Sequence, residues 1–207
     1  MAKIKKMIEK TAKKAAEAER RVTHQAAARE DHVAVKAAGA ATELADQPPL
    51  VALSLATLAV GLLMRRPTVI RSGARMVASH AIATGIKTVL KTAVDRTRPS
   101  RALEEGHRVE KGKGSGDTSL NSFPSGHTAG AVAVAQAVAA EASPAAAAPL
   151  QAAAGGVALL QPSRGQHYVS DVIAGAAIGW VSNRIAGAVM RVGESGVEAG
   201  LKRWRRG

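Results

Sequence analysis

Four long stretches of this sequence contain no charged side chain, and they restrict the fold more than any other feature. They are residues 47–64, 118–140, 142–163 and 172–183. Several approach the roughly 18–20 residues with which a helix crosses a bilayer, although alanine and glycine make each a weak membrane signal. Charged residues gather between these stretches and at both ends of the chain. This segregation favours an integral membrane protein over a soluble helical bundle.

The residues that would build the core are small. Apolar residues make up 46% of the 207 positions, whereas aromatic residues make up only 2%. Small side chains let helix backbones approach each other closely, whereas a β-sandwich needs aromatic and β-branched strands. We therefore expect an all-α fold: an Ala/Gly-rich bundle of about five core helices, transmembrane, with an extra basic helix at the N-terminus.

Proline and serine set the expected limits of these helices. The residue before a proline disfavours helical geometry, so Pro99 should end the second core helix near Thr97. Ser125 should cap the third, because serine accepts a hydrogen bond from the free N–H groups at a helix start. The five expected helices cover about 50–64, 74–97, 125–140, 146–160 and 168–190. Residues 100–122 should form a long loop, and loops of this length are often functional.

Two charged segments flank the expected core. Residues 1–45 alternate lysine and arginine with alanine and glutamate, which predicts a basic amphipathic helix, either solvated or lying on an anionic membrane surface. Residues 194–207 place a tryptophan among four basic residues, which is typical of an interfacial anchor. We therefore divide the chain into an N-terminal helix (1–45), a core (46–193) and a basic tail (194–207).

Charge and cysteine content limit the possible partners and chemistry. The net charge of +13 at pH 7 indicates an anionic partner: a nucleic acid, anionic lipid or a phosphorylated substrate. The chain contains no cysteine, so disulfides, thiolate zinc sites and cysteine nucleophiles are excluded.

The segment Pro124-Ser125-Gly126-His127 predicts a phosphate-binding helix start. The first N–H groups of a helix are unpaired and lie at the positive end of its dipole, so they bind phosphate. Gly126 lets a ligand approach the backbone closely. His127 then lies where an imidazole could protonate a leaving oxygen. An ordinary capped helix would explain Ser125 but not His127.

Two further pairs of residues suit the same chemistry. His167 and Asp171 are four residues apart, which places them on one helical face, and a carboxylate on one imidazole nitrogen makes the other a better nucleophile. Lys91 and Arg98 are seven residues apart, so on one helix they could converge on a single anion. Each pair alone has ordinary structural or lipid-headgroup explanations.

Together these stretches resemble the three-part signature of the type 2 phosphatidic acid phosphatase superfamily. That signature is Lys-x6-Arg-Pro, Pro-Ser-Gly-His and Ser-Arg-x5-His-x3-Asp, and the resemblance spans about residues 50–190. It implies that His167 attacks phosphorus to form a phosphohistidine, that Asp171 orients it, and that His127 protonates the leaving alkoxide. It also implies that the phosphate is bound by Lys91, Arg98, Ser125, Gly126 and an arginine of the third stretch. Neither a metal nor another cofactor is expected.

One position departs from the signature. The family places an arginine six residues before the nucleophile, where this chain has Gln161. The nearest arginine is Arg164, three residues before His167. We expect Arg164 to bind the phosphate from a shifted turn; otherwise the site lacks one cation.

The resemblance and the membrane signals together predict the substrate and location. We expect a phosphatase for phosphatidic acid, phosphatidylglycerol phosphate or a polyprenyl phosphate or pyrophosphate. It should lie in a bacterial inner membrane, with its site facing away from the cytoplasm and a re-entrant first apolar segment. The basic segment 1–36 and the tail should contact anionic lipid, and no nucleic acid partner is expected. The alternatives are a vanadium-dependent haloperoxidase-like enzyme and a non-enzymatic basic protein that binds nucleic acid or anionic membrane.

Overall fold

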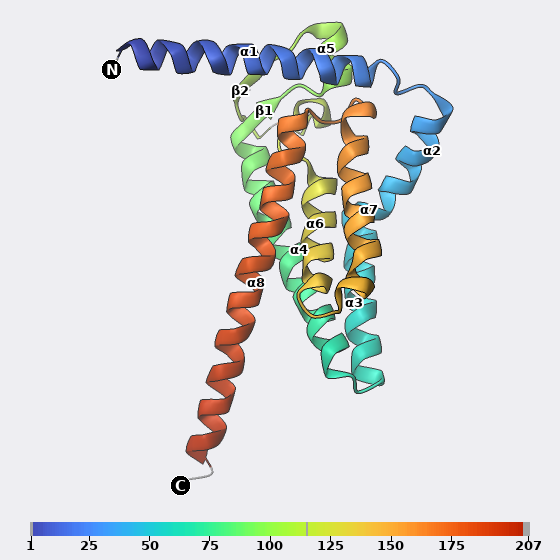
Figure 1. Ribbon diagram of the computed structural model, residues 1–207, viewed down its shortest axis with the longest axis vertical. Coiled ribbons are helices and arrows are strands. Elements are labelled where there is room, and N and C mark those ends of the chain that lie inside the picture. The colour runs from blue at the N-terminus through green and yellow to red at the C-terminus, as the bar shows by residue number, and fades with distance from the viewer. Residues whose placement is uncertain (1, 115, 205–207) are drawn as a thin grey trace.

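Five long helices lie side by side and form a bundle within the part of the chain that the structure describes (Figure 1). The structure is a computed structural model that describes residues 2–114 and 116–204, with side chains for 4–114 and 116–196. The helices of the bundle are α3 (Gln47–Leu63), α4 (Pro67–Ala93), α6 (Gly126–Ala139), α7 (Pro144–Ser163) and α8 (Val169–Trp204). The predicted all-α bundle is confirmed.

Helix α6 is the central helix, and it contacts α3, α4, α7 and α8. Its buried positions are mostly alanine. Two glycines of α8 permit an especially close approach. A Cβ atom on Gly175 would lie 2.5 Å from the carbonyl oxygen of Ser125, and one on Gly179 would lie 2.6 Å from that of Ala129. Small side chains therefore set the distance between helices, as the composition predicts.

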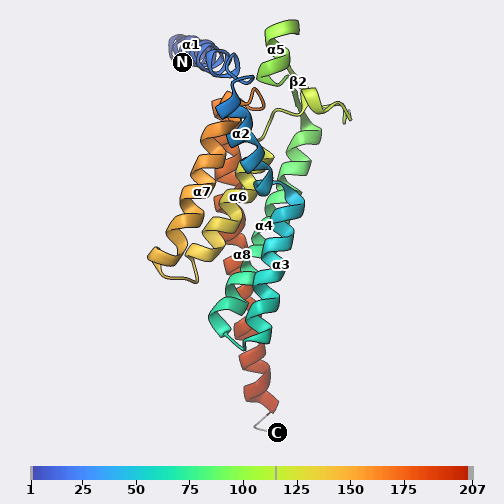
Figure 2. The same cartoon turned by 90° about the vertical axis from the view of Figure 1, so that its right-hand side faces the viewer.

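The N-terminal block is not a single helix. Helix α1 (Ala2–Ala27) is followed by a turn, by α2 (Val33–Thr42) and by the short 3₁₀-helix η1 (Glu43–Ala45). The Nδ1 atom of His32 accepts a hydrogen bond from the N–H of Ala34, which caps a new helix start that we did not expect. Figures 1 and 2 show that α1 lies across one end of the bundle, whereas α2 runs down beside α7.

The predicted loop 100–122 contains regular structure. It includes most of α5 (Pro99–Glu105), strand β2 (Val109–Lys111) and the 3₁₀-helix η2 (Thr118–Leu120). Strand β2 pairs antiparallel with β1 (Val94–Arg96). Because β1 must be extended to pair, α4 ends at Ala93 and not near Thr97. Helix α4 also begins at Pro67, earlier than expected, because proline suits the first position of a helix.

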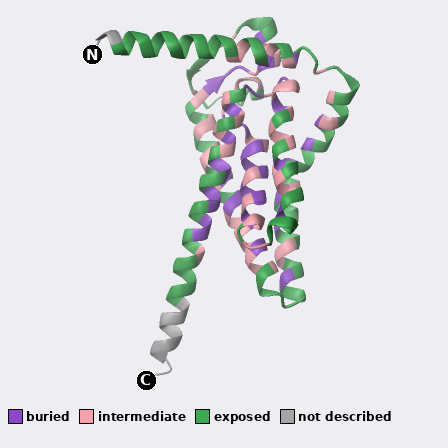
Figure 3. Cartoon of the chain, in the orientation of Figure 1, coloured by how far each residue is buried: buried purple, intermediate pink, exposed green. Residues whose placement is uncertain are grey.

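Apolar side chains are exposed on the outer faces of α3 and α8, which appear largely green in Figure 3. They are Val51, Leu53, Leu55, Val60, Leu62, Leu63, Ile173, Trp180, Val181, Ile185, Val189 and Val192. Within the described residues, Val169–Gly196 is long and apolar enough to cross a membrane. The pair Val33–Ala45 and Gln47–Leu63, bent by 50°, forms a second candidate if it counts as one span.

Three expectations stay predictions. Helix α2 runs from the end near α1, α3 continues to the opposite end and α4 returns (Figure 1). The bend of 50° between Val33–Ala45 and Gln47–Leu63 fits a broken span or a re-entrant segment, so the re-entrant first segment stays a prediction. The division at residues 45 and 193 stays a prediction. The predicted membrane anchor at 202–206 lies outside the residues whose side chains are described.

Candidate active site

Two loops meet at the end of the bundle across which α1 lies. One connects α4 to α6, and the other connects α7 to α8. The N–H of Ser100 in the first donates to the carbonyl of Gly165 in the second at 3.0 Å, and the N–H of Ser125 donates to the carbonyl of Asp171 at 3.0 Å. The three stretches that the sequence singled out therefore lie at the same end of the molecule, as predicted.

Ser125 caps α6 as predicted. Its hydroxyl accepts a hydrogen bond from the N–H of Thr128 at 3.4 Å, and the residue is fully buried. Gly126 is the first helical residue and His127 the second. The Nε2 atom of His127 has no hydrogen-bond partner among the described residues. This helix start therefore combines the positive dipole end, which attracts an anion, with an imidazole nitrogen free to exchange a proton.

His167 lies in the loop before α8, with only 3% of its surface exposed. Its Nδ1 atom lies 2.6 Å from the carbonyl oxygen of Ser122. A carbonyl oxygen only accepts, so Nδ1 carries the proton and Nε2 keeps its lone pair. Burial lowers the pKa of His167 well below its usual value, and the positive charges of Lys91 and Arg98 lower it further. The imidazole is therefore neutral at pH 7, with Nε2 available as a nucleophile.

Asp171 does not contact His167 directly, contrary to our expectation. Helix α8 begins at Val169, so His167 precedes the helix and the two residues do not share a helical face. The Oδ2 atom of Asp171 accepts from the N–H of Tyr168 at 2.9 Å, as in a capping box, and from the hydroxyl of Ser122 at 2.6 Å. Among the described residues, the carboxylate is therefore linked to the imidazole through Ser122.

Lys91 and Arg98 do not lie on one helix, because β1 separates them. Lys91 is in the last turn of α4, and its Nζ donates to the carbonyl of Asn121 at 2.7 Å. Arg98 immediately precedes α5 and donates to the side-chain oxygen of Gln166. Both charges lie close enough to His167 to lower its pKa. The two cations therefore approach the histidine from different elements.

Arg164 is held by the N-terminal segment. Its guanidinium donates to the hydroxyl of Thr42 at 2.5 Å and pairs with the carboxylate of Glu43. Gln161 is fully buried and donates to the backbone of its own helix at 3.1 Å. A neutral amide therefore occupies the position where the family signature has an arginine, while Arg164, at the end of α7, is paired with a carboxylate.

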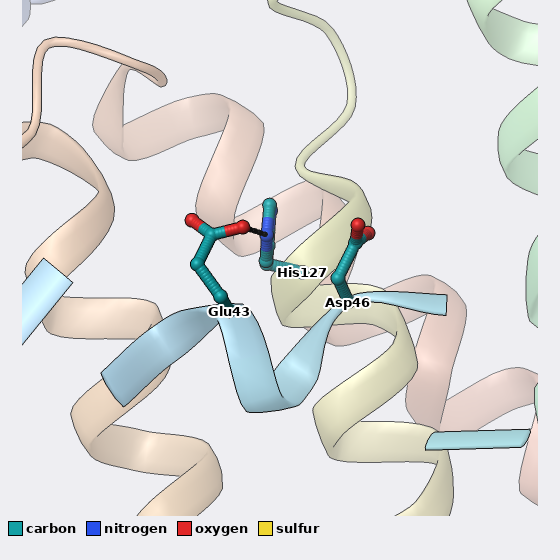
Figure 4. Close-up of side chains that lie close together, drawn as sticks. All are labelled: Glu43, Asp46 and His127. Atoms are coloured by element: carbon teal, nitrogen blue, oxygen red, sulfur yellow. Dashed lines mark ion pairs between the residues drawn. The ribbon is translucent and has the colours of Figure 1, made fainter. Parts of the chain in front are cut away.

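Glu43 and Asp46 lie on either side of His127 (Figure 4). The Oε2 atom of Glu43 is 3.9 Å from Nε2 of His127, and one ligand atom of each of the three residues lies within 4.8 Å of the others. A cation could fit such a spacing, but both acids are exposed and Glu43 already pairs with Arg164. The clearest consequence of this cluster is negative charge beside the imidazole.

Three residues that surround Asp171 were not predicted from the sequence: Arg96, Ser122 and Tyr168. Arg96 donates to Asp171 at 2.5 Å, and its guanidinium lies 4.0 Å from the centre of the Tyr168 ring. Their burial distinguishes them, since Arg96 is 9% exposed and the other two are fully buried. No motif or spacing in the sequence sets them apart from neighbouring polar residues.

A helical bundle that gathers a neutral buried histidine, a free helix N-terminus and several cations at one end has the features of a phosphate-handling enzyme. The chain matches the model of the PAP2 superfamily over residues 72–191 and belongs to that superfamily. It is therefore an enzyme of the phosphatase class, and the resemblance proposed from the sequence is confirmed. The match does not include α1, α2 or η1.

Two solved structures have a similar fold. LpxE from Aquifex aeolicus is 21% identical, with a TM-score of 0.62 over 80% of this chain and 92% of that chain. A transmembrane PAP2-type phosphatidylglycerolphosphate phosphatase from Bacillus subtilis is 20% identical, with a TM-score of 0.62 over 86% of each chain. No curated protein matches the chain by sequence. At these identities the structural likeness establishes the fold alone.

Proposed function

We propose that this protein is a metal-independent phosphatase that hydrolyses a lipid phosphate through a phosphohistidine intermediate. The observation that carries the proposal is the state of His167. Its Nδ1 is fixed on the carbonyl of Ser122, and it is neutral beside the cations Lys91 and Arg98. A neutral imidazole with one fixed nitrogen is prepared for nucleophilic attack by the other.

The site residues can be assigned to successive steps. Nε2 of His167 attacks the phosphorus, and the bond between phosphorus and the leaving oxygen breaks. His127 gives its proton to that oxygen and then takes a proton from the water that attacks the phosphohistidine, which releases phosphate and restores His167. Lys91, Arg98 and Arg164 balance the phosphoryl charge, and Ser125 and the N–H of Gly126 bind its oxygens. Positioned charge of this kind provides most of the catalysis in phosphoryl transfer.

The outer surface of the bundle supports a lipid substrate. Exposed apolar side chains lie along α3 and α8, and extensive exposed apolar surface marks contact with membrane or protein. The two similar structures are those of LpxE and of a phosphatidylglycerolphosphate phosphatase. We therefore propose phosphatidic acid, phosphatidylglycerol phosphate or a polyprenyl phosphate or pyrophosphate as the substrate.

The distribution of basic residues suggests how the bundle lies in a membrane. Helix α1 carries exposed lysines and lies across the site end, so we propose that it rests on an anionic lipid surface. Arg65, Arg66, Arg71 and Arg75 lie at or near the opposite end, whereas the basic residues of α1 lie at the site end, so the positive-inside rule does not by itself choose between the two ends. We propose that the four arginines mark the cytoplasmic end and that α1 rests on the other membrane surface. The site would then face away from the cytoplasm.

Phosphate release from defined lipids tests the proposal. Purified protein in detergent micelles, without added metal and with a chelator, should release inorganic phosphate from at least one of phosphatidic acid, phosphatidylglycerol phosphate and undecaprenyl phosphate or pyrophosphate. Vanadate should inhibit the release, because it mimics the phosphoryl transition state. Failure to hydrolyse any of these lipids would refute the proposal, and halide oxidation by the vanadate-loaded protein would favour a haloperoxidase.

Substitution of Glu43 by glutamine should strengthen substrate binding. Glu43 now pairs with Arg164 and approaches His127, so substrate phosphate must compete with its carboxylate. Because Glu43 is about half exposed, we expect the gain to stay within about 1 kcal/mol, or up to about a fivefold fall in KM. The matched control is Glu104→Gln, at an exposed position on α5. An unchanged or higher KM in Glu43→Gln would show that Glu43 does not compete with the substrate.

A further inference from the structure

A chain of buried polar contacts leads outward from His167. The carbonyl of Ser122 holds Nδ1 of His167 at 2.6 Å, and the hydroxyl of Ser122 donates to Asp171 at 2.6 Å. The other oxygen of Asp171 accepts from Arg96 at 2.5 Å. Each of these residues has at most 9% of its surface exposed. These buried contacts connect Arg96 to the imidazole through Asp171 and Ser122.

Arg96 lies between two carboxylates, and the second belongs to α1. Its Nη2 lies 3.4 Å from Oε2 of Glu19, while its Nη1 contacts Asp171 and donates to the hydroxyl of Ser170 at 2.7 Å. The other oxygen of Glu19 accepts from the N–H of Ser170 at 2.5 Å. Ser170 is in the first turn of α8, so Glu19 holds both Arg96 and the start of this helix.

Glu19 lies at the point along α1 where this helix first contacts the rest of the bundle. Residues 4–18 of α1 are exposed, whereas Glu19 is partly buried and Thr23 and Ala27 are fully buried. Helix α1 contacts α5, α7 and α8. Figure 1 shows α1 passing over the end of the bundle where α8 begins. The family match starts at residue 72, so Glu19 comes from outside the matched region.

We propose that Glu19 is a positioning residue for the phosphatase reaction, acting through Arg96, Asp171 and Ser122 on the imidazole of His167. Helix α1 is then part of the catalytic unit as well as a membrane contact. The expected effect of Glu19 on catalysis rests on the proposed function, whereas the contacts that link Glu19 to His167 do not depend on the substrate.

The substitution Glu19→Gln tests this proposal. Glutamine keeps the shape and can still accept from Ser170, but it lacks the charge that pairs with Arg96. Glu19 does not reach the phosphate, so kcat on the lipid that the wild type hydrolyses should fall by on the order of tenfold with KM unchanged. NMR of protein labelled with ¹⁵N-histidine reports the tautomer of His167. The wild type should show the Nδ1–H tautomer alone, whereas Glu19→Gln should show signals that depart from this single tautomer. Glu17→Gln, an exposed neighbour on the same helix, should match the wild type in both measurements.

Each other outcome has a defined meaning. Wild-type kcat together with unchanged His167 signals in Glu19→Gln would overturn the proposal. A fall in kcat without a change in the His167 signals would also overturn it, because the effect would not pass through the imidazole. A rise in KM alone would assign Glu19 to substrate binding instead. If the wild type hydrolyses none of the lipids, the proposed function fails, while the His167 signals still decide the positioning role.

Discussion

Substitution of His167 by glutamine should abolish phosphate release and leave the fold intact. Glutamine is close to histidine in size, and its amide can still donate to the carbonyl of Ser122, which holds Nδ1 in the native protein. It provides no nucleophilic nitrogen, so the covalent step is lost. We expect kcat to fall by on the order of a thousandfold or more, as when other enzymes lose a covalent nucleophile.

Trapping of the phosphorylated enzyme tests whether His167 carries the phosphoryl group, and an unchanged Tm of His167→Gln shows that the fold is kept. Wild-type protein mixed briefly with ³²P-labelled substrate and quenched in alkali should retain label with the acid lability of a phosphohistidine, and His167→Gln should retain none. The control His32→Gln changes an exposed histidine that caps α2 and has no role in the proposed reaction, so it should keep both label and activity. Substantial turnover by His167→Gln, or label that stays in it, would assign the nucleophile to another residue.

The sequence was most informative where one local rule decides the structure. Ser125 before an apolar run predicts a capped helix start, and the structure has it. Alanine and glycine in long uncharged stretches predict closely packed helices, and Gly175 and Gly179 lie against α6 as expected. Such features depend on neighbours in the sequence or on composition, so they can be inferred without knowing which segments meet.

The sequence was least informative where tertiary contacts decide the structure. The spacing of His167 and Asp171 suggested a shared helical face, but α8 starts between them and Asp171 caps its first turn. Likewise, Lys91 and Arg98 appeared to share a helix until β1 paired with β2. Glu19 reaches the site from a position that no spacing rule connects to Arg96. A contact between residues so far apart is visible only once the chain is folded.

Removal of the guanidinium of Arg96 should have the largest effect on stability. The residue is buried against Asp171, which is fully buried, and its guanidinium also stacks on Tyr168. In Arg96→Met the carboxylate would keep its bonds to Ser122 and the N–H of Tyr168 but would lose its buried countercharge. Breaking a buried ion pair by removing one partner costs about 3–5 kcal/mol. For a chain of this length that is a fall in Tm of about 6–20 °C.

A double variant separates the uncompensated charge from lost packing. The double variant Arg96→Met with Asp171→Asn no longer contains the unpaired carboxylate. Its fall in Tm, measured by thermal unfolding in detergent, should therefore be smaller than the sum of the falls in the two single variants. The control Arg108→Met removes an exposed arginine whose nearest carboxylate is 3.9 Å away, and it should leave Tm nearly unchanged. If the falls in Tm of Arg96→Met and Asp171→Asn simply add in the double variant, Arg96 stabilises the fold by packing on Tyr168 and not by neutralising Asp171. The link from Asp171 to His167 would then not need the charge of Arg96.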